Sequence, residues 1–217
     1  MGLRVGVLAS GSGSNLQALL DAASSGRLDA RIEVVVSDMP DAFSLERARR
    51  AGVAAEVVAW GAAPSREAHD DAVVDVLRRH QVDTVALAGY LRLVTPVLLA
   101  AFPGRVLNIH PALLPSFPGL HVQAAALEHG VKFSGCTVHF VDEEMDHGPI
   151  VIQAVVPVRD DDTPESLAAR ILREEHRIYP QALQYLAEGR LRIDGRRVVV
   201  DPPSPGSGSL HNPAVKF

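Results

Sequence analysis

Cysteine is almost missing from this sequence: Cys136 is the only one among 217 residues. A lone cysteine cannot form an internal disulfide, and so low a content suits a reducing compartment. Cys136 lies in the apolar segment 134–141, where we interpret it as a small core residue rather than a nucleophile. Long apolar runs are missing too. The first run covers only residues 5–9 before glycine and serine follow, which excludes a signal peptide or a membrane span there. We therefore expect a cytoplasmic protein without a membrane partner.

The sequence also has no excess of positive charge. It carries 21 Lys and Arg against 26 Asp and Glu, a net charge of -5, so we expect no nucleic-acid partner, although a local phosphate pocket stays open. The length and the 47% content of hydrophobic residues suit one domain with its own core. We expect that domain at residues 1–200. Residues 201–217 are rich in Pro, Gly and Ser and are expected to form a flexible tail. The oligomeric state, monomer or homodimer, is left open.

Short apolar runs alternate with amphipathic helical patterns in the first half of the chain. This alternation predicts an α/β fold, a Rossmann-like wound sheet of mostly parallel strands flanked by helices. The expected strands lie at residues 4–9, 31–37, 54–59, 82–88 and 104–109. One helix is expected where apolar residues follow helical spacing, at Leu16, Leu19, Leu20 and Ala23. A second helix is expected after Ser65, a residue type that caps helix N-termini.

After residue 130 the pattern changes. Residues 134–141 and 148–158 predict two strands that add to the sheet in antiparallel fashion, joined by the loop 142–147.

The last part of the chain predicts a long helix and a hairpin. Thr163, followed by proline, marks a helix start, and the helix should run to about Gly189. Pro180 is expected to kink or split it. Residues 190–200 predict a hairpin around the dipeptide Asp194-Gly195.

A Gly/Ser-rich turn follows the first expected strand and opens directly onto a helix. Gly11 and Gly13 lack side chains that would block a close approach, and Ser14 and Asn15 add polar donors. Backbone N–H groups at a helix N-terminus favour a phosphate. The turn is neither GxGxxG nor a P-loop, so nucleoside triphosphate hydrolysis is a weak interpretation. A purely structural turn with Ser14 as helix cap is the alternative.

The most informative residues are an amide, an imidazole and a carboxylate. Asn108 and His110 lie in the run NIHPALLPSFPGLH, and Asp146 lies in the loop that follows. Such a set can stabilise an oxyanion, carry a proton and orient the proton carrier without a side-chain nucleophile, which fits direct transfer of a small acyl group. The alternative is that the first two only end a buried strand while the third sits in a turn.

Six segments together resemble the glycinamide ribonucleotide formyltransferases, the folate-dependent enzymes of purine synthesis. The resemblance runs from about residue 3 to about residue 200, and its segments are GSGSN, SREAHD, AGYLRLV, NIHPALLPSFPGLH, HFVDEEMDHGPI and EEHRIYP. It implies transfer of the formyl group of 10-formyltetrahydrofolate to the amine of N1-(5-phospho-D-ribosyl)glycinamide, with small-molecule substrates, no metal and no ATP.

The resemblance also implies a role for each matching residue. Asn108, His110 and Asp146 would be catalytic. The phosphorylated substrate would contact Gly13, Ser14, Asn15 and Glu175. The folate would contact Arg66, Leu91, Arg92, Leu93, Val94, Asn108, Asp142, Glu143, Glu144, Met145 and Asp146. The sequence departs from the family pattern at Ser12, where Asn is frequent, and at His147, where Gly often follows the catalytic Asp.

Three histidines raise the question of a zinc site. The spacing of His110, His121 and His139 is not that of a zinc motif, so we expect no metal. We expect His139 to be a hydrogen-bonded core residue and His121 to border the substrate pocket. The remaining histidines are expected at the surface.

Three rival functions stay open. Formyltetrahydrofolate deformylases share this type of site but carry an added N-terminal domain, whereas the first strand is expected here at residue 3. Methionyl-tRNA formyltransferases have a longer chain with a nucleic-acid-binding domain, which an acidic chain of this length does not suggest. A non-catalytic nucleotide- or folate-binding module is the third, and the intact set of three polar residues argues against it.

Overall fold

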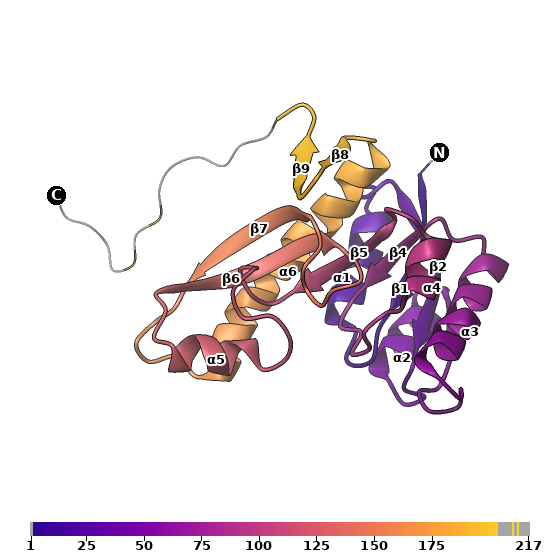
Figure 1. The fold of residues 1–217 in the computed structure, drawn as a ribbon, viewed down its shortest axis with the longest axis horizontal. Helices are drawn as coiled ribbons and strands as arrows, with labels where there is room; N and C mark the ends of the chain where they lie inside the picture. The colour runs from indigo at the N-terminus through magenta and orange to yellow at the C-terminus, as the bar shows by residue number, and fades with distance from the viewer. Residues whose placement is uncertain (1, 204–209, 211, 213–217) are drawn as a thin grey trace.

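The computed structural model describes residues 2–203, 210 and 212. Its centre is a nine-stranded sheet with the order β3-β2-β1-β4-β5-β6-β7-β9-β8 (Figure 1). The strands are β1 (Leu3–Leu8), β2 (Ala30–Ser37), β3 (Ala54–Val57), β4 (Thr84–Leu87), β5 (Val106–His110), β6 (Phe133–Phe140), β7 (Ile150–Pro157), β8 (Leu191–Asp194) and β9 (Arg197–Val200). The helices are α1 (Ser14–Ser24), α2 (Phe43–Arg50), α3 (Arg66–Arg79), α4 (Pro96–Ala101), α5 (Val122–Glu128) and α6 (Pro164–Ala187).

The α/β fold expected from the sequence is confirmed. β1 to β5 run parallel to one another, β6 pairs with β5 in antiparallel fashion, and β7 pairs with β6 in antiparallel fashion. The chain starts in the middle of the parallel part, moves outward to β3, and then crosses to β4 on the other side of β1. The order therefore reverses between β1 and β4, and in open wound sheets ligands bind at the carboxyl ends of the strands at such a reversal.

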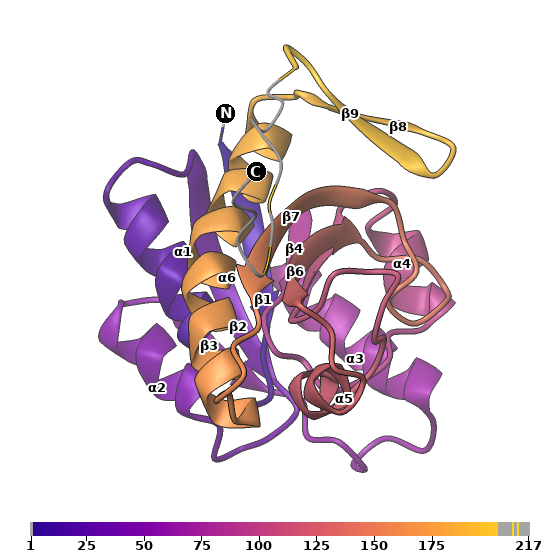
Figure 2. The same ribbon diagram turned by 90° about the vertical axis from the view of Figure 1, so that its left-hand side faces the viewer.

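The helices cover both faces of the sheet, which explains why the parallel strands are largely apolar on both faces. Alternate residues of a strand point to opposite faces. In β1, Val5 and Val7 pack into the core beneath α1 and α6, whereas Leu8 packs into the core beneath α3 and α4. Figure 2 shows α1 and α6 on one side of the sheet and α3 and α4 on the other. Within the described residues, no helix is long and apolar enough to span a membrane.

The long helix α6 begins where expected and is not split at Pro180, which leaves only a kink of the two outcomes expected there. Its N-terminus has a capping box, in which the side chains of Thr163 and Ser166 each bond the other residue's backbone N–H. The helix runs through Pro180 without being split. We attribute this to packing, because Tyr179, Pro180 and Leu183 are buried and hold this turn against the sheet. That burial offsets the one backbone hydrogen bond that proline removes.

The hairpin is confirmed, shifted by one residue. Asp194 pairs with Arg197, so the turn consists of Gly195 and Arg196 rather than being centred on Asp194-Gly195. Gly195 has a φ of 59°, which glycine adopts without strain. Most of the expected flexible tail, residues 204–209, 211 and 213–217, lies outside the described residues, so the division at residue 200 stays a prediction. Asn212 donates to the backbone carbonyls of Lys132 and Val158 at 2.6 and 2.8 Å.

Candidate active site

The carboxyl ends of β1, β4 and β5 meet at one edge of the sheet, and the expected site residues lie on these strand ends or on the loops that follow. The loops after β1 and β4 are joined across the strand reversal: Ser10 donates its backbone N–H to Gly89 and accepts the backbone N–H of Leu91 on its hydroxyl. The adjacent strand places Asn108 beside Leu87. Parallel pairing thus gathers segments that are far apart in the sequence.

The turn expected to bind phosphate is a tight glycine turn at the start of α1. Gly13 is the N-cap, has a φ of 69°, and would bring a Cβ to 2.8 Å from the Cα and Cβ of Ser44. A side chain here would clash with α2, so Gly13 is required by the packing of the turn. Gly11 is different, since a Cβ there would meet nothing within 4 Å. The space beside Gly11 leaves room for a phosphate to reach the backbone N–H groups of the turn.

Asn15 and Glu175, which the sequence separates widely, form one buried pair. The side-chain amide of Asn15 donates to Glu175 Oε2 at 2.7 Å, and both residues are buried. Burial raises the pKa of Glu175, and the hydrogen bond from Asn15 opposes that rise. α6 therefore delivers a carboxyl group to the start of α1, next to the glycine turn.

Arg47 was not anticipated from the sequence. Its guanidinium reaches from α2 back to the turn, donating to the Ser12 carbonyl at 2.8 Å and to the Gln17 side chain at 3.0 Å. It brings a positive charge to a turn that has none of its own. The sequence offered only an indirect indication of Arg47: the turn has no basic residue, so a cation for the phosphate has to come from another element.

Asn108 and His139 form a pair because of strand register. The two residues lie directly opposite each other in the antiparallel pairing of β5 with β6, and Asn108 Nδ2 lies 3.2 Å from His139 Nε2. His139 Nδ1 lies 2.8 Å from the Phe140 carbonyl oxygen and donates a hydrogen bond to it. Burial lowers the pKa of His139, so the neutral ring accepts from Asn108 on Nε2. The expectation of a buried, hydrogen-bonded His139 is confirmed. This contact orients the amide of Asn108 and leaves its second N–H for another acceptor.

His110 lies two residues after Asn108, so both side chains project from the same face of β5. Its Nδ1 is 3.3 Å from Asp146 Oδ2, and its Nε2 donates to the Phe117 carbonyl at 2.8 Å. The same Asp146 oxygen accepts the backbone N–H of Gly119 at 2.8 Å. The imidazole is buried, with an oxygen acceptor beside each nitrogen. The carboxylate and imidazole expected to act together are therefore in contact.

The loops around this pair hold three non-glycine residues in the left-handed backbone region. Phe117, His121 and Asp146 have φ values of 54°, 56° and 52°. Such a conformation costs about 1–2 kcal/mol for a residue with a Cβ and persists only where the surroundings enforce it. All three contact the site: Phe117 accepts from His110, Asp146 faces His110, and His121 lines the pocket beside them. The strain indicates that these loops are shaped for the site.

A pocket of about 370 Å³ opens in front of Asn108, His110 and Asp146. Its walls are mostly apolar, and the three polar residues belong to its lining. Of the residues expected to contact folate, the pocket is lined by Leu91, Arg92, Leu93, Val94, Asn108, Glu144, Met145 and Asp146. Arg66, Asp142 and Glu143 do not line it. The Arg66 guanidinium instead donates to the Leu93 carbonyl at 3.0 Å, behind the loop that forms the wall. His121, expected at the pocket border, does line it.

Arg92 lines the pocket, but its charge is already paired. Its Nε donates to Asp38 Oδ2 at 2.6 Å, and its guanidinium stacks 4.6 Å from the Trp60 ring centroid. The Asp38 side chain is fully buried. Trp60 in turn contacts His69 edge-on. His69 was expected at the surface and is buried instead, with Nε2 2.9 Å from the Tyr90 hydroxyl. The prediction failed because His69 lies on the inner side of α3, where the loop after β4 covers it.

The remaining chemistry-bearing residues give no second site of this kind. Cys136 is fully buried, and burial raises its pKa to about 12, which confirms it as a core residue. Among the described residues, no group of three or more His, Cys, Asp or Glu side chains is arranged to hold a metal ion.

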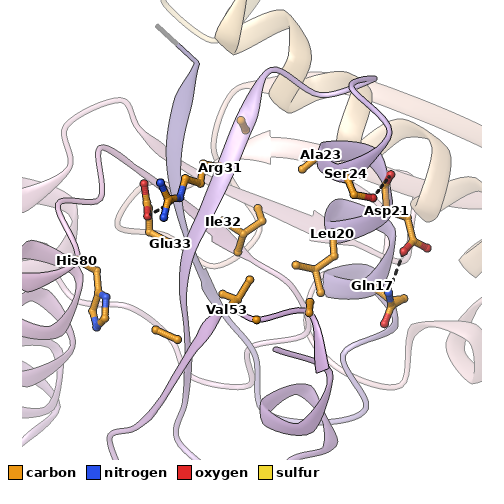
Figure 3. A pocket seen from close by; sticks show the side chains of 14 residues that line it. Gln17, Leu20, Asp21, Ala23, Ser24, Arg31, Ile32, Glu33, Val53 and His80 are labelled. Carbon is orange, nitrogen blue, oxygen red and sulfur yellow. Dashed lines mark hydrogen bonds and ion pairs between the residues drawn. The ribbon is translucent and has the colours of Figure 1, made fainter. Parts of the chain in front are cut away.

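A larger hollow of about 790 Å³ lies elsewhere, beside α1 and the amino-terminal half of β2 (Figure 3). It is wide open, and its polar groups bond to each other: Gln17 donates to Asp21 at 2.9 Å, and Arg31 pairs with Glu33 at 3.2 Å. It also lies at the opposite ends of the strands from the site described above. Neither its position nor its chemistry points to a reaction.

Comparison with known proteins gives consistent matches along nearly the whole chain. The profile of the family described as Formyl transferase matches residues 3–183. The phosphoribosylglycinamide formyltransferase of Escherichia coli (strain K12) is 42% identical over 203 residues, covering 90% of this chain and 96% of that protein. The crystal structure of glycinamide ribonucleotide transformylase 1 from Symbiobacterium toebii is 59% identical with a TM-score of 0.91, covering 92% of this chain and 94% of that one. A formyltetrahydrofolate deformylase from Pseudomonas syringae pv. tomato str. DC3000 is similar at 30% identity and a TM-score of 0.85, covering 92% of this chain and 66% of that one.

Proposed function

Since the chain belongs to the formyl transferase family, we propose that it transfers the formyl group of 10-formyltetrahydrofolate to the amine of N1-(5-phospho-D-ribosyl)glycinamide. The observation that carries this proposal is the contact of Asp146 with His110 in a mostly apolar pocket that Asn108 also lines. The relatives that match this chain over most of its length and are named for that reaction support the choice of substrates.

The two substrates would occupy different parts of the site. The glycine turn, with Arg47 behind it, offers backbone N–H groups and positive charge to a phosphate, and the Asn15–Glu175 pair offers polar groups to the ribose or amine. The apolar pocket suits a flat heterocycle, and Leu91, Leu93 and Val94 form one wall of it. The formyl group would then lie where the two parts meet, in front of Asn108.

The reaction follows from the groups at that point. The substrate amine attacks the formyl carbon, a C–N bond forms, and negative charge develops on the formyl oxygen. The free N–H of Asn108 and the His110 ring would stabilise this charge, and one such donor is typically worth about 10² to 10³ in rate. Asp146 holds His110 and would accept the proton that the amine loses. As the bond to the folate nitrogen breaks, that nitrogen takes up a proton, which we assign to His110 and which its Nε2 can supply once it leaves the Phe117 carbonyl.

Several wider properties belong to the same proposal. We infer that the protein acts in the cytoplasm on small molecules, needs no metal, and has neither a nucleic-acid nor a membrane partner. Residues 1–200 would form the single catalytic domain.

The test is a formyl-transfer assay with both substrates. The parent protein should consume the formyl donor only when the phosphorylated amine is present, and Asn108→Ala should lower turnover by about 10² to 10³ with little change in either Michaelis constant. Release of formate from the donor without the amine would identify a deformylase instead. Binding of both compounds without turnover would identify a non-catalytic module.

A further inference from the structure

The β8–β9 hairpin lies beyond the part of the chain that the family profile matches. The match ends at residue 183, whereas the hairpin covers residues 191–200. It follows α6 and lies beside β7 (Figure 2), where a single pair, Ile150 with Arg197, joins it to the sheet. Residues 192–197 of the hairpin are exposed, and Leu191 and Val198 are its residues that pack against the hydrophobic core. Its turn, however, contacts the loop that carries Asp146.

The contact is made by Arg196, at the tip of the hairpin, to His147. One guanidinium nitrogen lies 2.5 Å from His147 Nε2, and the other donates to the His147 backbone carbonyl at 2.7 Å. His147 Nδ1 lies 2.8 Å from Asp142 Oδ2. The guanidinium nitrogen near Nε2 also lies 3.2 Å from His147 Nδ1, so it contacts the imidazole ring as a whole rather than one ring nitrogen. One side chain of the hairpin thus holds both the ring and the backbone of the residue after Asp146.

The loop 142–147 needs outside contacts of this kind to keep its shape. Asp146 is in the left-handed region with a φ of 52°, a conformation that does not persist unaided. The far end of the loop is pinned at Gly148, where a Cβ would come within 1.8 Å of the Phe140 carbonyl oxygen. His147 is the single residue between the strained Asp146 and the closely packed Gly148. Its backbone carbonyl is where Arg196 binds.

We propose that Arg196 is a positioning residue, which holds the loop 142–147 in the form that presents Asp146 to His110 and Met145 to the pocket. The role of the pocket in binding the formyl donor rests on the proposed function, whereas the effect of Arg196 on the loop does not. The sequence departs from the family pattern by having His147 after Asp146. We explain this departure by the contact, because the His147 ring is one of the two groups that Arg196 binds.

The experiment compares Arg196→Ala with Arg192→Ala. Arg192 is on the same hairpin and forms only a surface pair with Asp194, so its variant removes the same charge without touching the loop. Amide hydrogen exchange of residues 144–147 should rise about tenfold in Arg196→Ala, the effect of losing one charge-assisted contact, and stay at the parent value in Arg192→Ala. Exchange in β1 and β4 should be unchanged in both variants, which separates a local effect from loss of folding.

Kinetics supply the second readout. In Arg196→Ala the Michaelis constant for the formyl donor should rise about tenfold, while that for the phosphorylated amine stays within about twofold. Arg196→Lys should recover part of the loss because it keeps the charge. His147→Ala should have a smaller effect than Arg196→Ala, because it removes the ring contact and leaves the backbone carbonyl that Arg196 binds.

Two results would overturn the proposal: loop exchange that does not differ between Arg196→Ala and the parent, or an equal effect of Arg192→Ala. A parent protein without formyl-transfer activity would refute the proposed function alone, because the exchange measurement tests the contact without any substrate.

Discussion

Replacing Asp146 with Asn separates the charge of this residue from its shape. Asp146 Oδ2 receives both the Gly119 N–H at 2.8 Å and the His110 contact at 3.3 Å, while Oδ1 lies 3.8 Å from His139 Nε2. An asparagine oxygen in the place of Oδ2 can accept from both partners, and its amide nitrogen then faces the free side near His139. The variant should therefore fold and bind ligands like the parent, since only the negative charge is lost.

The size of the effect follows from the role of that charge. A lost acid–base or orienting partner typically costs about 10² to 10⁴ in turnover, or about 2.7 to 5.4 kcal/mol in the activation barrier. We expect the loss in kcat, with both Michaelis constants within a few-fold of the parent values.

Asp160→Asn is the matched control. Asp160 has a side chain that is 97% exposed and pairs only with Lys132, so the same chemical change there should leave turnover unaltered. An Asp146→Asn protein nearly as active as the parent would refute the proposed role of this charge. Asp142, in the same loop, would then be the next carboxylate to test.

Three further predictions concern the glycine turn, the start of α6 and metals. Gly13→Ala should lower the melting temperature, because its Cβ would clash with Ser44 at a φ of 69°, whereas Gly11→Ala should fold normally and raise the Michaelis constant of the phosphorylated substrate. Equal melting temperatures would contradict this assignment. Asp162→Asn should destabilise the protein by about 1–3 kcal/mol at neutral pH, because a buried carboxylate that accepts from Arg170 is lost. The hydrogen bond from Arg170 holds the pKa of Asp162 well below its usual range. The stabilisation is therefore complete above the unfolded-state pKa of about 4 and shrinks as the pH falls toward the folded-state pKa. Denaturant titrations of the parent and Asp162→Asn across acidic pH measure this change in stability. Exhaustive chelation should leave formyl transfer intact, and loss of activity that zinc restores would refute metal independence.

Local sequence patterns were sufficient for most of the secondary structure. The five expected parallel strands, the cap at Ser65 and the start of α6 at Thr163 all occur in the structure. Each depends on a few neighbouring residues, through alternation of apolar side chains, a hydroxyl that accepts an N–H, or a proline in the first turn. Pro180 shows the limit of such rules, since the helix continues through it where tertiary packing outweighs one missing hydrogen bond.

The candidate site residues were likewise named from the sequence, because the resemblance to a known family implies roles for Asn108, His110 and Asp146, and these roles stay predictions. What only the tertiary structure decided is which atoms meet. Strand register places Asn108 against His139, and a long-range contact joins Asn15 to Glu175. The turn of the hairpin reaches His147, although 49 residues separate it from Arg196. Local propensities carry no information about such distances, because they result from how the sheet orders its strands and how the loops at its carboxyl edge pack together.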